Sequence, residues 1–223
     1  MHIIEGYLPA EWCLLWFIIA VPIVYLGARK IIETMRSDPA QKIPIALSGA
    51  FIFLLSSLKM PSATGSSSHP TGTGLSVALY GVTVTAFLAT IVLIFQAILL
   101  AHGGLTTLGA NTVSMGVFGP AVGFLVWRTL RKMKIGIAPA MFMTAALADL
   151  STYVITALQL TLAHGSGDYM WAFTEFMATF AVTQIPIAVI EGIIFAIFAD
   201  YLHRTRPELF GTECDANEMP EAA

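Results

Sequence analysis

The sequence predicts an all-α polytopic membrane protein with about seven transmembrane helices and an extracytoplasmic amino terminus. Of its 223 residues, 57% are hydrophobic and only 11% are charged, whereas about a quarter of the residues of soluble domains are charged. Long apolar runs recur along the chain, and the basic residues gather between them. Because lipid offers no hydrogen-bond partner for backbone amides and carbonyls, such runs are expected to cross the membrane as helices.

Six apolar runs divide the chain, at residues 9–26, 43–58, 75–101, 111–127, 137–163 and 173–202. No polar block between them is long enough to form a second domain. We therefore expect residues 1–207 to form a single membrane-embedded domain in the cell (plasma) membrane. Residues 208–223 are expected to be an acidic, disordered cytoplasmic tail.

The basic residues determine how often the run 75–101 crosses the membrane. A single crossing there would place the second cluster of basic residues outside, whereas an even number keeps all clusters cytoplasmic. We therefore expect a tight hairpin of two short helices turning near Tyr80-Gly81, or a re-entrant element, which brings the total to about seven helices. Every Lys and Arg except Lys59 belongs to a cluster: Arg29, Lys30, Arg36 and Lys42; Arg128, Arg131, Lys132 and Lys134; Arg204 and Arg206.

This topology places four of the five histidines on the face opposite the positive charge. His2, His69, His102 and His164 all fall in outside segments, and His203 lies inside with the arginines. The predicted topology rests on the apolar runs and the basic residues alone. The convergence of the histidines therefore points independently to a metal-binding face, although His164 is interpreted as an ordinary loop residue.

The chain begins with MHIIEGYLP, which has neither a basic n-region nor a cleavage site, so no cleavable signal peptide is expected. Because His2 is large, Met1 is expected to be retained. The Met1 amine, the His2 amide nitrogen and the His2 imidazole can then close adjoining five- and six-membered rings around one metal ion. Planar nitrogen donors favour nickel, copper or cobalt, and His69 could supply a fourth nitrogen. The alternative is a solvated terminal histidine without a metal.

Three segments, MHIIEGYLP, LKMPSATGSSSHPTGTG and FQAILLAHGGLTTLGAN, resemble the signature segments of the CbiM family. These are the substrate-specific membrane components of cobalt energy-coupling factor transporters, related to the nickel components called NikM. The resemblance implies a seven-helix fold. It also implies that the Met1 amine, the His2 amide and imidazole, and the His69 imidazole bind Co²⁺, the transported substrate, with no organic cofactor. Ni²⁺ remains the alternative substrate.

The resemblance further implies partners and a pathway. The partners are a coupling transmembrane protein (CbiQ), an ATPase (CbiO) and a small membrane protein (CbiN), with no nucleic acid, and the imported cobalt would feed cobalamin biosynthesis. The sequence contains no GxxxxGK[ST] phosphate-binding loop, so we expect a transporter subunit and not an ATPase. An intramembrane metalloenzyme is the alternative of a different class. It is disfavoured because HExxH is absent and because four nitrogen ligands leave no position for an activated water.

Several further residues are candidates for supporting roles. His102 could orient His69 through a hydrogen bond or act as a further ligand, or it could be a solvated residue at a helix end. Thr107 and Asn111 are candidates for shaping the loop that follows it. Asp149, Glu175 and Glu191 lie in or near apolar runs, where they could line a metal path or join helices by hydrogen bonds. The small residues Ala46 and Ala50 form either a docking face for the coupling protein or an ordinary packing face.

Overall fold

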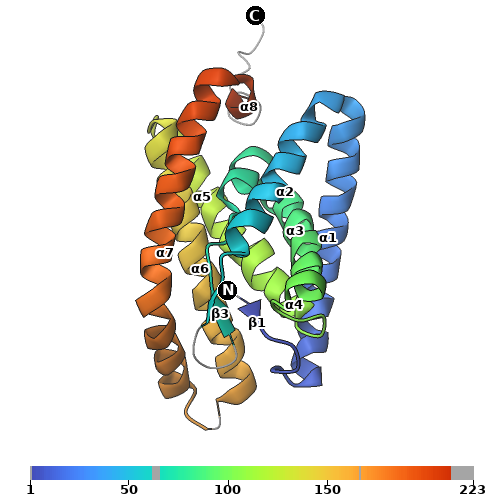
Figure 1. The fold of residues 1–223 in the computed structure, drawn as a ribbon, viewed down its shortest axis with the longest axis vertical. Coiled ribbons are helices and arrows are strands. Elements are labelled where there is room, and N and C mark those ends of the chain that lie inside the picture. The colour runs from blue at the N-terminus through green and yellow to red at the C-terminus, as the bar shows by residue number, and fades with distance from the viewer. Residues whose placement is uncertain (1, 62–65, 166, 212–223) are drawn as a thin grey trace, which may run out of the picture.

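The computed structural model describes residues 2–61, 66–165 and 167–211. Within them, six helical segments are long and apolar enough to cross a membrane, and Figure 1 shows the longest of them running side by side along the long axis of the molecule. The all-α polytopic prediction is therefore confirmed. The helices are α1 (Ala10–Ser37), α2 (Lys42–Ser56), α3 (Gly74–Leu100), α4 (Leu108–Asn111), the π-helix η2 (Thr112–Phe118), α5 (Gly119–Lys132), α6 (Ile137–His164), α7 (Tyr169–Thr205) and α8 (Glu208–Gly211).

The long helices extend beyond the apolar runs because polar residues form their ends. The 28 residues of α1 span about 42 Å, more than the hydrocarbon thickness of about 30 Å. At its end, the Asp38 N–H donates to the Thr34 carbonyl at 2.9 Å, and the Asp38 side chain accepts from Ala40 N in the short 3₁₀ turn η1 (Pro39–Gln41). At the start of α7, the Asp168 side chain accepts from Trp171 N.

Helix α3 is two helices joined by a sharp turn at Gly81. This residue has φ 76° and ψ −176°, a conformation that is essentially restricted to glycine. The expected break near Tyr80-Gly81 is thus present. The helix preceding it, 74–80, is too short to cross a membrane, and the helix following it is long enough to do so.

Two lysine contacts show that the chain passes along this bundle and returns. Lys59 Nζ donates to the Leu100 carbonyl at 3.0 Å, at the end of α3, and Lys30 Nζ donates to the Tyr80 carbonyl at 3.3 Å, beside the turn at Gly81. The segment that leads to the turn at Gly81 is not helical throughout, because its residues 66–73 precede α3. Residues 66–81 are all buried, so protein surrounds this irregular backbone and no lipid reaches it.

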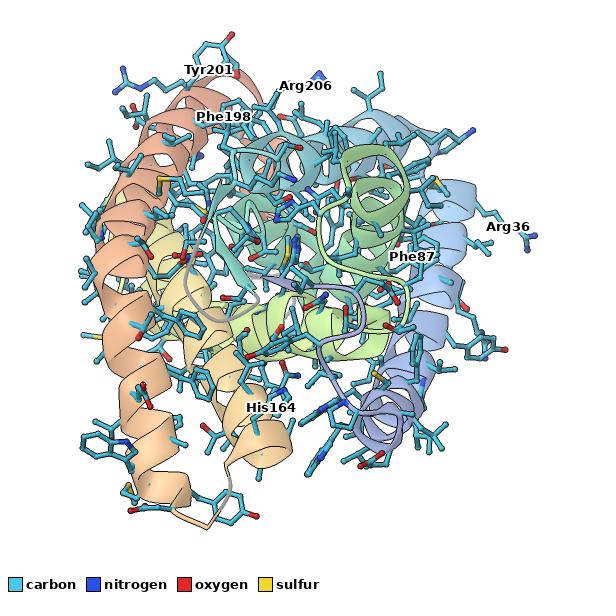
Figure 2. All side chains as sticks on the ribbon, turned by 60° about the horizontal axis from the view of Figure 1, so that its bottom comes forward. Arg36, Phe87, His164, Phe198, Tyr201 and Arg206 are labelled. Atoms are coloured by element: carbon cyan, nitrogen blue, oxygen red, sulfur yellow. The ribbon has the colours of Figure 1, made fainter. Side chains whose placement is uncertain are left out.

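The three basic clusters lie at one end of the bundle. Tyr80 donates its hydroxyl hydrogen to Gln41 beside the first cluster. Phe210 contacts both Trp127, next to the second cluster, and His203, next to the third. Figure 2 shows His164 at the opposite end from Arg206. This arrangement agrees with the positive-inside argument, while the side of the membrane that each end faces stays a prediction.

Large apolar side chains cover the outside of the helices. In water such a surface would promote aggregation, whereas in a bilayer it contacts acyl chains. The most exposed members include Leu14, Ile18, Val21, Leu54, Ile98, Leu99, Leu125, Val182 and Ile197.

Two features of the structure were not part of the expected layout of helices and loops. A small antiparallel sheet, in the order β1 (His2–Ile3), β3 (Ser66–Ser68), β2 (Met60–Pro61), lies among the helices, as Figure 1 shows for β1 and β3. It forms because the extended loop is buried and its backbone groups need partners. In the part of the expected tail that the structure describes, Phe210 of α8 is only 8% exposed and packs on Trp127. Residues 212–223 of the expected tail lie outside the described part.

Candidate metal-binding site

Three histidine side chains from distant parts of the chain meet inside the molecule. His2 lies in β1, His69 directly follows β3, and His102 lies between α3 and α4, and each is at most 2% exposed. One ring nitrogen from each lies within 4.8 Å of the others. Nitrogen ligands on opposite sides of a metal ion are separated by about 4 Å. The spacing of the three nitrogens therefore suits ligands of one ion.

Hydrogen bonds give each ring a defined orientation. His2 Nδ1 lies 3.0 Å from His102 Nε2, which also lies 2.7 Å from the Ser67 hydroxyl. His69 Nδ1 donates to the Pro70 carbonyl at 2.8 Å. The His69 proton is thereby placed on Nδ1, and Nε2 keeps its lone pair for a ligand. The hydrogen bond expected from His102 to His69 is made to His2 and Ser67 instead.

Three ring nitrogens have no hydrogen-bond partner in the described part of the chain: His2 Nε2, His69 Nε2 and His102 Nδ1. Buried polar atoms without partners are uncommon and call for an explanation. Burial lowers the pKa of His102 to about 3. Burial, followed by the neighbouring His69, also lowers the pKa of His2 well below its usual range. The neutral form that results is the form of imidazole that binds a metal ion.

Asn111 and Thr107 hold the strand that carries His2. The Asn111 amide accepts from Ile3 N at 2.8 Å and donates to the Ile3 carbonyl at 3.0 Å. The Thr107 hydroxyl donates to the same carbonyl at 2.8 Å. Both side chains are buried and fix the backbone of the residue next to His2. Met1, the remaining predicted ligand residue, lies outside the described part.

Polar side chains of α7 hold the segment around His69. The Thr183 hydroxyl lies 2.8 Å from that of Ser68, and Gln184 Nε2 donates to the His69 carbonyl at 3.1 Å. Gln184 also donates to Asp149 of α6, at 2.8 and 2.7 Å. Asp149 thus takes part in a helix-to-helix hydrogen bond, one of its two expected roles.

The other acidic residues in apolar runs behave differently. Glu191 bonds to the backbone of Thr71 and Gly72 in the His69 loop. Glu175 is exposed on the outside of α7 and contacts none of the three histidines. His164 is exposed as well, and its Nε2 lies 3.0 Å from the Tyr7 carbonyl. The sequence therefore identified the three clustered histidines, but Gln184 was not among the predicted site residues. The signal for Gln184 is a polar amide within an apolar run.

The two proposed docking residues, Ala46 and Ala50, are exposed on α2. Ile43 and Leu54 of the same helix are also exposed, whereas Ser48 is buried. Ala46 and Ala50 therefore do not form a packing face within the described part of the chain.

Six membrane-length helices around an internal cluster of imidazoles define the class: a multi-pass membrane protein with grouped metal-ligating side chains. The chain belongs to the CbiM family, whose model, described as the cobalt uptake substrate-specific transmembrane region, matches residues 2–209. The relatives include a putative cobalt transport protein CbiM from Methanococcus voltae, 52% identical over 94% of both chains. A cobalt transport protein CbiM from Desulforamulus reducens is 48% identical over 94% of this chain and 84% of its own.

The fold is also similar to solved structures. A truncated transition metal transporter matches with a TM-score of 0.82 over 92% of this chain and 99% of its own. A second transition metal transporter matches with a TM-score of 0.75 over 92% of this chain and 100% of its own. The sequence identities are 22% and 24%, so these matches bear on the fold alone. The family resemblance inferred from the three sequence segments is confirmed by the family model.

Proposed function

We propose that the chain is the substrate-binding membrane subunit of an ATP-driven energy-coupling factor importer for Co²⁺ that feeds cobalamin biosynthesis. The observation that carries this proposal is the cluster of His2, His69 and His102, fully buried within a multi-pass membrane protein. Imidazole suits late first-row transition metals. The membership of the chain in a cobalt uptake family supports cobalt as the ion.

The proposed ligands are the Met1 amine, the His2 amide nitrogen and Nδ1, and His69 Nε2. Only Nδ1 of His2 can close the six-membered ring with its own amide nitrogen. His69 Nε2 is available because Nδ1 donates to Pro70. In this proposal His102 releases His2 Nδ1 when the ion binds and keeps its hydrogen bond to Ser67, so it supports the site without being a ligand.

Transport against a gradient needs partners, since the sequence contains no phosphate-binding loop motif. The proposed partners are the coupling protein CbiQ, the ATPase CbiO and the small protein CbiN. The exposed small-residue face of Ala46 and Ala50 is the proposed contact with CbiQ. Small residues allow a partner helix to approach closely within the membrane.

Nickel is the second candidate substrate because of the donor set. For nitrogen ligands the Irving–Williams order places nickel above cobalt. Affinity alone therefore does not select cobalt, and the preference in cells would come from metal availability and from the geometry of the His69 loop.

Radioactive cobalt uptake tests the proposal. Cells without their own cobalt importer would express the chain with CbiQ, CbiO and CbiN, and uptake would be compared with His69→Ala and with an ATPase-inactive CbiO. We expect accumulation only with the native chain and an active ATPase. Equal uptake by His69→Ala would contradict the ligand set, and uptake independent of ATP hydrolysis would contradict the transporter class.

A further inference from the structure

Glu191 makes all of its described hydrogen bonds to the loop that carries His69. Its carboxylate accepts from Thr71 N at 2.6 Å, from the Thr71 hydroxyl at 2.9 Å and from Gly72 N at 2.9 Å. The side chain is 0% exposed. A buried carboxylate in a membrane helix is costly unless it is well paired, and such residues are functional by default.

The opposite side of the loop is closed by the backbone of α2. Gly72 has φ +72°, and a Cβ atom placed there would lie 2.6 Å from the Phe51 carbonyl oxygen and 2.7 Å from Ile52 Cα. The loop therefore has no room to move toward α2. The hydrogen bonds to Glu191 keep it from moving the other way, so the loop has one position.

A second contact from α7 holds His69 itself. Gln184 donates to the His69 carbonyl, and its amide is oriented by both oxygens of Asp149. Gln184 and Glu191 are seven residues apart, which places them on one face of α7. Two turns of a single helix thus hold the loop on either side of Pro70.

We propose that Glu191 is a positioning residue that holds His69 at the metal site through Thr71 and Gly72. This inference rests on the proposed function, because it assigns Glu191 a role in the same site. A carboxylate that only joined helices would bond to a neighbouring helix. The hydrogen bonds of Glu191 in the described part run instead to the loop, two and three residues after His69.

The test uses nickel as the spectroscopic probe on the full-length protein in detergent. In Glu191→Ala the Met1–His2 chelate remains, but His69 is no longer held in place, so a weaker-field water takes the fourth position. We expect the absorption band of bound nickel to shift to longer wavelength and to match the band of His69→Ala. Affinity should fall about 10- to 100-fold, as for other residues that orient a ligand.

Four further variants make the result specific. Glu175→Ala changes an exposed acid on the same helix and should bind nickel as the native protein does. Glu191→Gln retains one acceptor oxygen and should give an intermediate affinity. Thr71→Val removes the hydroxyl that donates to Glu191 and also contacts Thr73, so it tests the same contact if Glu191→Ala does not fold, with Thr73→Val as its control.

The outcomes separate this inference from the proposed function. If His69→Ala binds nickel with native affinity and spectrum, the proposed ligand set is wrong. If His69→Ala is altered but folded Glu191→Ala and Thr71→Val show the native spectrum and affinity, only the role of Glu191 is overturned. If Glu191→Ala only loosened the helix bundle, it would bind less nickel, but the bound nickel would not show the spectrum of His69→Ala, and the role of Glu191 would be overturned.

Discussion

His102 Nε2 lies between two partners, 3.0 Å from His2 Nδ1 and 2.7 Å from the Ser67 hydroxyl. The atom of His2 that the proposed chelate requires is therefore already held by a hydrogen bond in this structure. His102 and Ser67 together fix the ring of His2 before any ion binds. A metal ion would replace the contact between His2 and His102 and leave the contact between His102 and Ser67.

Replacing His102 by alanine should weaken cobalt binding without abolishing it. His2 would lose the side chain that orients its ring, and groups in this position contribute about 10- to 100-fold to metal affinity. Calorimetric titration of the purified protein measures the change. His164→Ala is the matched control, because this histidine is exposed and contacts only the Tyr7 carbonyl among the hydrogen bonds described. Complete loss of binding in His102→Ala would make His102 a ligand.

Replacing Asn111 by alanine should also weaken metal binding, although Asn111 bonds to the backbone of Ile3, the neighbour of His2, and not to His2 itself. The substitution leaves the buried Ile3 N–H without its described acceptor. That loss costs about 1–3 kcal/mol, so affinity should fall by about 5- to 150-fold. Thr106→Ala removes an exposed hydroxyl 3.4 Å from Gly6 N and serves as the control in the same titration. Native affinity in Asn111→Ala would show that the strand needs no such support.

Reporter fusions test the orientation of the chain in the membrane. Because the basic clusters gather at one end, a reporter fused after Lys134 should read as cytoplasmic. A reporter fused near Gly104, at the end that carries His164, should read as external. A cytoplasmic signal at Gly104 would overturn the predicted orientation.

Competition between nickel and cobalt tests the donor set. If nitrogens dominate the site, the isolated subunit should bind nickel at least as tightly as cobalt near neutral pH. Equilibrium dialysis of the purified protein against both ions gives the ratio directly. A strong intrinsic preference for cobalt would point to oxygen ligands instead.

The return of the chain at Gly81 was predictable from charge and composition. The clusters around Arg29 and Arg128 required an even number of passes between them, and a glycine offered the turn. The backbone conformation of the segment before Gly81 was not predictable. Residues 66–73 read as a polar loop in the sequence, and they are buried because β1 and β2 pair with part of their backbone and side chains of α7 bond to the rest.

The candidate site, too, was predictable from the sequence only in part. His2, His69 and His102 were identifiable because the predicted topology places all three on the same face. The partners of those residues could not be paired from the sequence. Which helix face reaches the loop depends on how α7 packs, so the contacts of Gln184 and Glu191 appear only in three dimensions.

The amino-terminal chelate is the central claim, and one inserted residue tests it most directly. A leucine inserted between Met1 and His2 is large enough for Met1 to be retained and separates the free amine from the imidazole by one residue, so the adjoining five- and six-membered rings can no longer form from the same three donors. Membrane insertion and the fold should remain intact, as judged by elution profile and helical content. Calorimetric titration with cobalt should then show loss of high-affinity binding. Unchanged cobalt affinity in the insertion variant would contradict the claim.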